Sequence, residues 1–173
     1  MDQAVALVEA YLELNGYFVV TEYPILLRDE GWRVATDLDI LAIRFARDSA
    51  YSEDPLVSRP DRELGVPDDV MDMIIGEVKE GRATLNPAVR SPRVISAALE
   101  RFGCCTANES DEIMTRLKHQ GYGLTSGGHQ VRYVSFASRG YASGAEREVS
   151  LHQICRFLRS HLSQHWGRIA KPS

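Results

Sequence analysis

Apolar residues recur every three or four positions in four stretches of this 173-residue chain, at residues 2–15, 92–102, 110–119 and 149–166. This spacing gathers the apolar side chains on one face of a helix, so the pattern predicts four amphipathic α-helices. Asn15 and Gly16 mark the end of the first helix, because glycine is favoured just past a helix C-terminus. Ser110 is the expected N-cap of the third.

Short apolar runs rich in Ile, Leu and Val predict β-strands at residues 17–27, 32–45, 70–78 and 130–137. Pro24 lies inside the first strand and indicates an edge strand or an irregularity. Residues 46–69 are charged, contain proline and show no period. Loops of this length are usually functional or disordered, so we consider both a lid that contacts a substrate and plain disorder.

The predicted element order is α-β-β-β-α-α-β-α. It indicates a single α/β domain over residues 1–173, with residues 46–69 as a charged loop insertion. Three consecutive strands favour an antiparallel meander, and strands alternating with helices favour a sheet covered on both faces. We therefore expect a mixed central β-sheet, made of the meander plus a further strand, flanked by α-helices.

Three charged residues stand at strand positions where apolar residues are expected. Because side chains alternate along a strand, Asp39 shares a face with Leu41, while Glu77 and Lys79 share a face with Ile75. Burying such charges is costly unless they are paired or bound to a metal ion. The pattern therefore indicates a functional site that brings the two strands together.

An Asp in one strand followed by Glu-x-Lys in a later strand resembles the PD-(D/E)xK nuclease superfamily, which has the restriction-endonuclease-like fold. Asp39 matches the metal-binding Asp of the family, and Glu77 and Lys79 match its Glu-x-Lys. Leu38 stands where the family often has Pro. The family core is a helix, a three-stranded meander, a helix and a further strand, in line with the predicted elements.

The resemblance implies a metal-dependent nuclease that hydrolyses phosphodiester bonds in nucleic acid. DNA is the expected substrate, and the expected mode of cleavage is that of an endonuclease. Asp39, Glu77 and the backbone carbonyl of Val78 would hold Mg²⁺ or Mn²⁺, because hard divalent cations prefer oxygen ligands. The cation would lower the pKa of a bound water. Lys79 would orient that water and add positive charge near the phosphate.

Two accessory residues follow from the same resemblance. The family often brings an acidic residue from its first helix towards the metal, and Glu9 is the best-placed candidate. Arg82, just beyond the motif, is a candidate phosphate contact. The alternative for both is an ordinary surface residue. Asp37, two residues before Asp39, is interpreted as an exposed strand-end residue.

The charge of the chain is unevenly distributed. Residues 1–81 contain seven Lys and Arg and 18 Asp and Glu, a net charge of −11, whereas residues 82–173 carry +7. An acidic half with metal ligands and a basic half facing phosphates would suit a nuclease, although two solvated faces give the same asymmetry. With no apolar run near the ~20 residues of a membrane span, no signal-peptide pattern and three cysteines, we expect a cytoplasmic protein outside the membrane.

Two other interpretations stay open. In the first, the chain is a non-catalytic restriction-endonuclease-like module for DNA binding or protein assembly, and Asp39, Glu77 and Lys79 form a buried ion-pair cluster. In the second, an unrelated α/β domain carries a chance Glu-x-Lys. A homodimer is kept as a candidate assembly.

Overall fold

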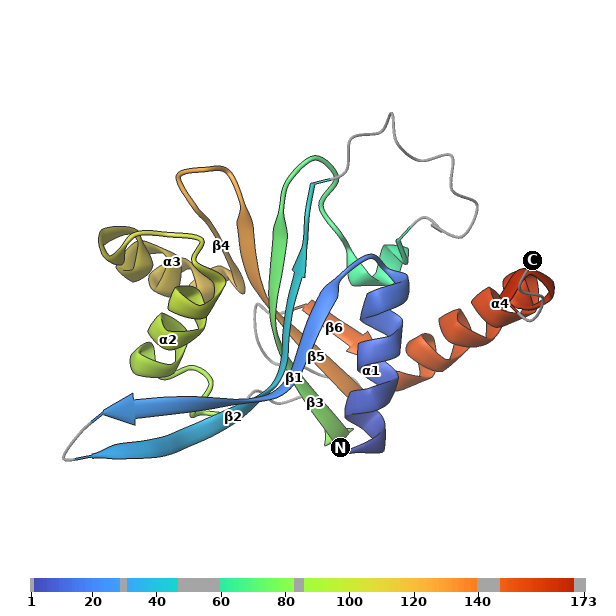
Figure 1. Cartoon of the computed structure of the whole chain (residues 1–173), viewed down its shortest axis with the longest axis horizontal. Coiled ribbons are helices and arrows are strands. Elements are labelled where there is room, and N and C mark those ends of the chain that lie inside the picture. Colours follow the sequence, from blue (N-terminus) through green and yellow to red (C-terminus); the bar gives the residue numbers. More distant parts are fainter. Residues whose placement is uncertain (1, 29–30, 47–59, 83–85, 140–146, 170–173) are drawn as a thin grey trace.

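The computed structural model describes residues 2–28, 31–46, 60–82, 86–139 and 147–169. Within these residues the chain forms a mixed, open six-stranded sheet flanked by four α-helices (Figure 1), which confirms the predicted α/β class. The helices are α1 (Gln3–Leu14), α2 (Pro92–Phe102), α3 (Ala107–Gln120) and α4 (Leu151–Ile169). The strands are β1 (Phe18–Arg28), β2 (Trp32–Arg44), β3 (Asp72–Arg82), β4 (Tyr122–Leu124), β5 (Gln130–Arg139) and β6 (Arg147–Ser150).

The first three strands form an antiparallel meander, as the element order predicts. β5 then joins β3 in parallel, so the order across the sheet is β1-β2-β3-β5-β4. The sequence pattern does not predict β4 and β6, because three and four residues are too few to establish an alternation. Both pair with the outer edge of β5: β4 runs antiparallel to its first half and β6 parallel to its second half.

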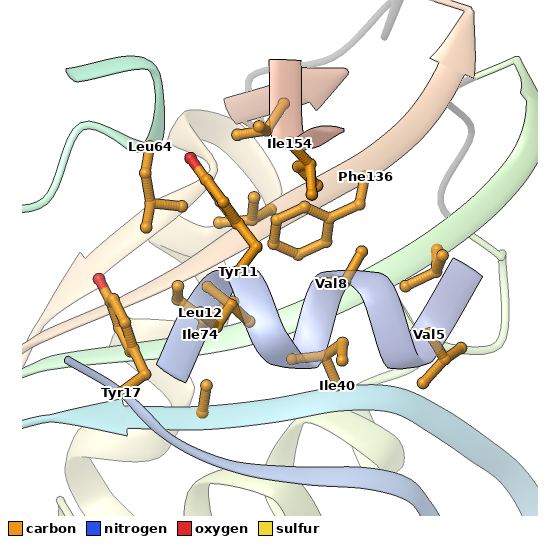
Figure 2. Packing of buried hydrophobic residues seen from close by; sticks show 14 of the residues in the cluster. Val5, Val8, Tyr11, Leu12, Tyr17, Ile40, Leu64, Ile74, Phe136 and Ile154 are labelled. Carbon is orange, nitrogen blue, oxygen red and sulfur yellow. The ribbon is translucent and has the colours of Figure 1, made fainter. Parts of the chain in front are cut away.

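Helices cover both faces of the sheet (Figure 1). α1 and α4 pack on one face and α2 and α3 on the other, so the buried residues form two clusters. Figure 2 shows the first cluster, where α1 lies over the strands. Ile74 and Val78 of β3 belong to this cluster, and Met73 and Ile75 belong to the second. The alternation along β3 therefore decides which helices each of its side chains faces.

Two helix starts differ from the prediction. Thr106 rather than Ser110 is the N-cap of α3: its backbone N–H donates to Glu109 Oε2 at 2.8 Å in a capping box. The prediction of Ser110 is wrong because the Thr-x-x-Glu signature begins earlier, and the Ser110 hydroxyl donates to the Thr106 carbonyl at 3.1 Å. Val149, which we expected to open the last helix, belongs to β6 instead.

The predicted insertion is partly built into the core. Residues 47–59 of it lie outside the described residues, but Arg62–Leu64 forms a short 3-10 helix whose Leu64 is fully buried in the first cluster (Figure 2). Just before it, Asp61 Oδ2 accepts hydrogen bonds from the Tyr11 hydroxyl at 3.0 Å and from Gln153 Nε2 at 2.9 Å. Residues 61–64 therefore join α1 to α4 as part of the core rather than as a lid.

A buried ion pair holds the first residue of β3. Arg132 Nη2 donates to Asp72 Oδ2 at 2.8 Å, and both side chains are at most 5% exposed. The Tyr17 hydroxyl also donates to Asp72, and Arg132 Nη1 donates to the Leu64 carbonyl at 2.8 Å. Burial, together with the charge of Asp72, raises the pKa of Tyr17. This network fixes the positions of β1, β3, β5 and the 3-10 helix relative to one another.

None of the described helices combines the length and apolar character needed to cross a membrane.

The buried position of Leu64 predicts that the insertion contributes to stability. Leu64→Ala should lower the free energy of unfolding by roughly 2–5 kcal/mol, because the truncated side chain leaves a cavity in the first cluster. Urea denaturation measures this loss. Leu162→Ala, at a 45% exposed position of α4, is the matched control and should change stability by less than about 0.5 kcal/mol. Equal effects in the two variants would contradict a core role for residues 61–64.

Candidate active site

β2 and β3 approach each other closely and then separate. Their pairing extends to Ile40 opposite Gly76 and ends there. A Cβ at position 76 would lie 2.8 Å from Cβ of Ile40 and 3.1 Å from Cε2 of Phe136. Only glycine therefore allows β3 to sit this close to its neighbours at the last pair before the two strands part.

Asp39 and Glu77 are the next residues on the two strands, so the carboxylates lie at the point of separation. Asp39 Oδ2 accepts a hydrogen bond from the backbone N–H of Val78 at 2.8 Å. The Asp39 side chain thus takes over the contact with β3 that the backbone of β2 no longer makes. This hydrogen bond holds the half-buried Asp39 carboxylate beside the Glu-x-Lys segment.

Glu77 is almost completely buried, and its partners differ in exposure. Its side chain is 3% exposed, and Oε1 lies 2.5 Å from Nζ of Lys79, whose side chain is 36% exposed. The backbone N–H of Asn86 also donates to the Glu77 carboxylate. Glu77 is therefore held by one cationic partner that opens to solvent and by one neutral backbone donor.

Burial raises the pKa of Glu77 more than its partners lower it. Burial raises the pKa of the Glu77 carboxyl above its usual value, and hydrogen bonding and charge from Lys79 offset part of this rise. The charge of Asp39 raises the pKa further, so the two carboxylates lie within electrostatic reach of each other. A nearby cation would favour the charged form of both groups.

β1 is distorted directly opposite Asp39. Thr21 pairs with Ile40 and Tyr23 with Leu38, so Glu22 faces Asp39 across the ladder. Glu22 has φ of 51°, the left-handed region that residues other than glycine rarely adopt. Beyond this point β1 and β2 continue as a hairpin arm (residues 23–28 and 32–38) that leaves the sheet (Figure 1). Strain at such a position often accompanies a functional site.

The structure gives the place of one of the two accessory side chains. Glu9 is half-buried on α1, which covers the sheet face of Ile74 and Val78. Glu77 alternates with these two residues along β3, so its side chain leaves the opposite face of the sheet. Arg82 ends β3 with its backbone opposite Arg139, and its side chain lies outside the described part of the chain.

Asp37 is exposed on the hairpin arm, opposite Pro24, in agreement with its interpretation as a solvated strand residue.

Sequence reasoning missed three residues around the carboxylates. Asn86 acts through its backbone N–H, which any residue except proline supplies, so its side chain carries no signal. Glu22 is missed because no sequence rule expects a left-handed residue inside a strand. Ser135 lies opposite Glu77 on β5, where an alternating strand pattern gave no reason to single it out.

The oxygen atoms of Asp39, Glu77 and the Val78 carbonyl are of the ligand type that a hard divalent cation prefers. Among the described residues, no three His, Cys, Asp or Glu side chains come together as a metal site. Asp39, Glu77 and the Val78 carbonyl are a smaller set, and their oxygen donors suit Mg²⁺ or Mn²⁺, which keep several waters. Because Lys79 contacts Glu77 Oε1, a cation bound at that oxygen would require the ammonium to move.

Comparisons of the chain with protein-family models, with curated proteins and with solved structures find no match.

The left-handed conformation of Glu22 predicts an unusual order of stability. Glu22→Gly should be more stable than Glu22→Ala by about 1 kcal/mol, because both variants lose the same side chain but only glycine adopts positive φ without strain. Chemical denaturation of the pair gives the difference. The reverse order, which is usual in a regular strand, would show that position 22 relaxes to an extended conformation.

The raised pKa of Glu77 predicts the pH dependence of stability. A carboxyl whose pKa is higher in the folded than in the unfolded state binds more protons when folded, so its contribution becomes less favourable as pH rises above about 4.5. Glu77→Gln removes this titration. The stability of Glu77→Gln relative to the parent should therefore increase between about pH 4 and pH 8, measured by urea unfolding at each pH.

The pKa of Glu109 is shifted in the opposite direction to that of Glu77, so Glu109 serves as a comparison. Hydrogen bonds from Ser126 and Thr106 lower the pKa of Glu109 to about 2, so its contribution is present above the unfolded value and is lost as pH falls through about 2. Glu109→Gln should therefore lose stability relative to the parent at neutral pH, and the loss should shrink on acidification. The same pH trend in both variants would contradict the assignment for Glu77.

Proposed function

We propose that this chain is a metal-dependent nuclease with a restriction-endonuclease-like fold that hydrolyses phosphodiester bonds in nucleic acid, with DNA as the expected substrate. The observation that carries the proposal is the meeting of two carboxylates and an ammonium where β2 and β3 separate. Asp39 reaches β3 through Val78 N–H, and Glu77 pairs with Lys79. Each of these residues has the chemistry that the resemblance requires at its position.

The topology supports the proposal. An α-helix, a three-stranded antiparallel meander, helices and a further strand parallel to β3 follow one another in the order of the family core. Additional short strands extend the sheet beyond β5 without disturbing this order.

The uneven charge of the chain gives no second line of support. Glu77 and Lys79 share the parity of Met73 and Ile75, which pack under α2 and α3. Those helices contain four Lys and Arg and four Asp and Glu, so their formal net charge is zero.

In the proposed mechanism, Asp39, Glu77 and the Val78 carbonyl hold the cation, and each protein group has a separate task. The cation, when bound, neutralises phosphate charge and acidifies a water. The Val78 N–H orients Asp39, and the Asn86 N–H orients Glu77. Lys79, released from Glu77, directs its ammonium at the attacking water and the non-bridging oxygens. Paired cuts in a duplex would need a second copy of the chain, because each chain supplies one such set of residues.

The non-catalytic module is the second candidate, and the short contact between Lys79 and Glu77 is the observation that favours it. In that case the three charged residues serve the fold alone. The two candidates differ in what a substitution does to stability, because removing one partner of a structural buried pair leaves an uncompensated charge at a cost of roughly 3–5 kcal/mol.

Substitutions of the three residues test the proposal. Asp39→Asn keeps an oxygen that accepts from Val78 N–H while removing the charge, and Glu77→Gln does the same for Asn86 N–H. Both should abolish Mn²⁺ binding and plasmid nicking. Lys79→Ala should bind Mn²⁺ at least as well as the parent but nick at least about 100-fold more slowly, because an ammonium acts on the reaction and not as a ligand.

The control is Asp37→Asn, an exposed carboxylate on the same strand that should leave both properties unchanged. Nicking is measured with Mg²⁺ and with EDTA, and binding by calorimetry. A parent that neither binds Mn²⁺ nor cleaves, together with large destabilisation in all three variants, would overturn the nuclease proposal in favour of the non-catalytic module.

A further inference from the structure

Ser135 carries a buried hydroxyl without a partner. It lies in the middle of β5 and its side chain is fully buried. Within the described residues, its Oγ makes no hydrogen bond. Buried polar groups are paired in the great majority of cases, and an exception calls for an explanation. The position of Ser135 supplies one, because its partner in the parallel β3–β5 ladder is Glu77.

The two side chains project from the same face of the sheet. Val131 and Tyr133 of β5 pack in the second cluster, so Ser135, two residues further on, has the same parity. Glu77 has the parity of Ile75, which packs in that cluster too. Residues paired in a parallel ladder are side-by-side neighbours, so the side chains of Ser135 and Glu77 leave the sheet next to each other.

The present partners of Glu77 explain why the hydroxyl has none. Oε1 of Glu77 contacts Lys79 Nζ, and the carboxylate also accepts from the Asn86 N–H. In this arrangement the carboxylate is turned towards its cationic partner. A carboxylate has about four lone-pair positions and therefore retains capacity for a further donor when its orientation changes.

We propose that Ser135 is a positioning residue for Glu77: its hydroxyl donates a hydrogen bond to the Glu77 carboxylate when Lys79 withdraws and a divalent cation binds. The inference rests on the proposed function. A neutral hydroxyl suits this task because it supports a metal-bound carboxylate without placing a second positive charge beside the cation. Lys79 compensates Glu77 in the metal-free protein, and Ser135 orients Glu77 in the metal-bound protein.

The first experiment measures Mn²⁺ affinity by calorimetry without nucleic acid. Ser135→Ala should bind Mn²⁺ about tenfold more weakly than the parent, in the range seen when a hydrogen bond to a metal ligand is lost. Its melting temperature should stay equal or rise, because the hydroxyl that it removes has no partner in the metal-free protein.

Thr125→Val is the matched control. Thr125 is 6% exposed in the turn before β5, and its Oγ1 accepts from the His129 N–H at 3.1 Å, away from Glu77. This variant should melt at a lower temperature but bind Mn²⁺ as the parent does. The two variants thus separate a loss of affinity from a loss of stability.

The second experiment needs no metal. In EDTA, Ser135→Ala is compared in the parent and in Lys79→Ala, where Glu77 has lost its ammonium. The hydroxyl should then serve Glu77, so Ser135→Ala should lower the melting temperature by about 2–4 °C in the Lys79→Ala protein and not in the parent.

The outcomes separate the two proposals. If the parent binds Mn²⁺ and Ser135→Ala binds it equally well, the role of Ser135 is overturned while the proposed function stands. If the parent binds no Mn²⁺, the proposed function fails. The comparison in EDTA then decides on Ser135: an effect only in the Lys79→Ala protein supports its pairing with Glu77, and equal effects in both proteins overturn it.

Discussion

The central strand β3 buries two carboxylates, and the way each is compensated determines much of the structure. Asp72 at its start is fully enclosed: Arg132 contacts both carboxylate oxygens, Tyr17 donates as well, and both charges are out of solvent. Glu77 is equally hidden, but its cationic partner Lys79 is 36% exposed. The open partner at Glu77 leaves room for exchange with a solvent cation.

Two backbone features create the space between β2 and β3. Gly76 lets β3 approach Ile40 to a distance that no side chain would allow, and the strands diverge directly after this contact. On the other side of β2, Glu22 adopts a left-handed conformation opposite Asp39, where the hairpin arm turns away from the sheet. Asp39 therefore stands between a tight contact and a bend, and its carboxylate is free to cross to Val78 N–H. Strain at Glu22 is consistent with a conformation held for the site rather than for the strand.

The sequence predicts what repeats along the chain and misses what depends on distant partners. Four helices and four of the six described strands follow from apolar periodicity, because burial of one face imposes it, and the meander follows from the element order. Leu64 is missed because a single apolar residue in a charged loop has no period, although it is fully buried. The charged positions of Asp39, Glu77 and Lys79 are visible in the sequence as violations of the strand pattern. Asn86, which donates to Glu77, and Ser135, the ladder neighbour of Glu77, come from other parts of the chain, and no local pattern contains these placements.

The exposure of Lys79 makes its ion pair with Glu77 easier to release than the enclosed pair of Asp72 and Arg132. The Lys79 ammonium is partly exposed, so solvent screens its pairing with Glu77 and the long lysine side chain gains freedom when released. Breaking an enclosed pair such as Asp72 with Arg132 would instead cost roughly 3–5 kcal/mol. In the proposed function, the contact with Lys79 is therefore the one that a divalent cation would displace. The contact compensates Glu77 in the metal-free protein, so in the proposed function the same lysine would stabilise the fold before the cation binds and act on the phosphate after it.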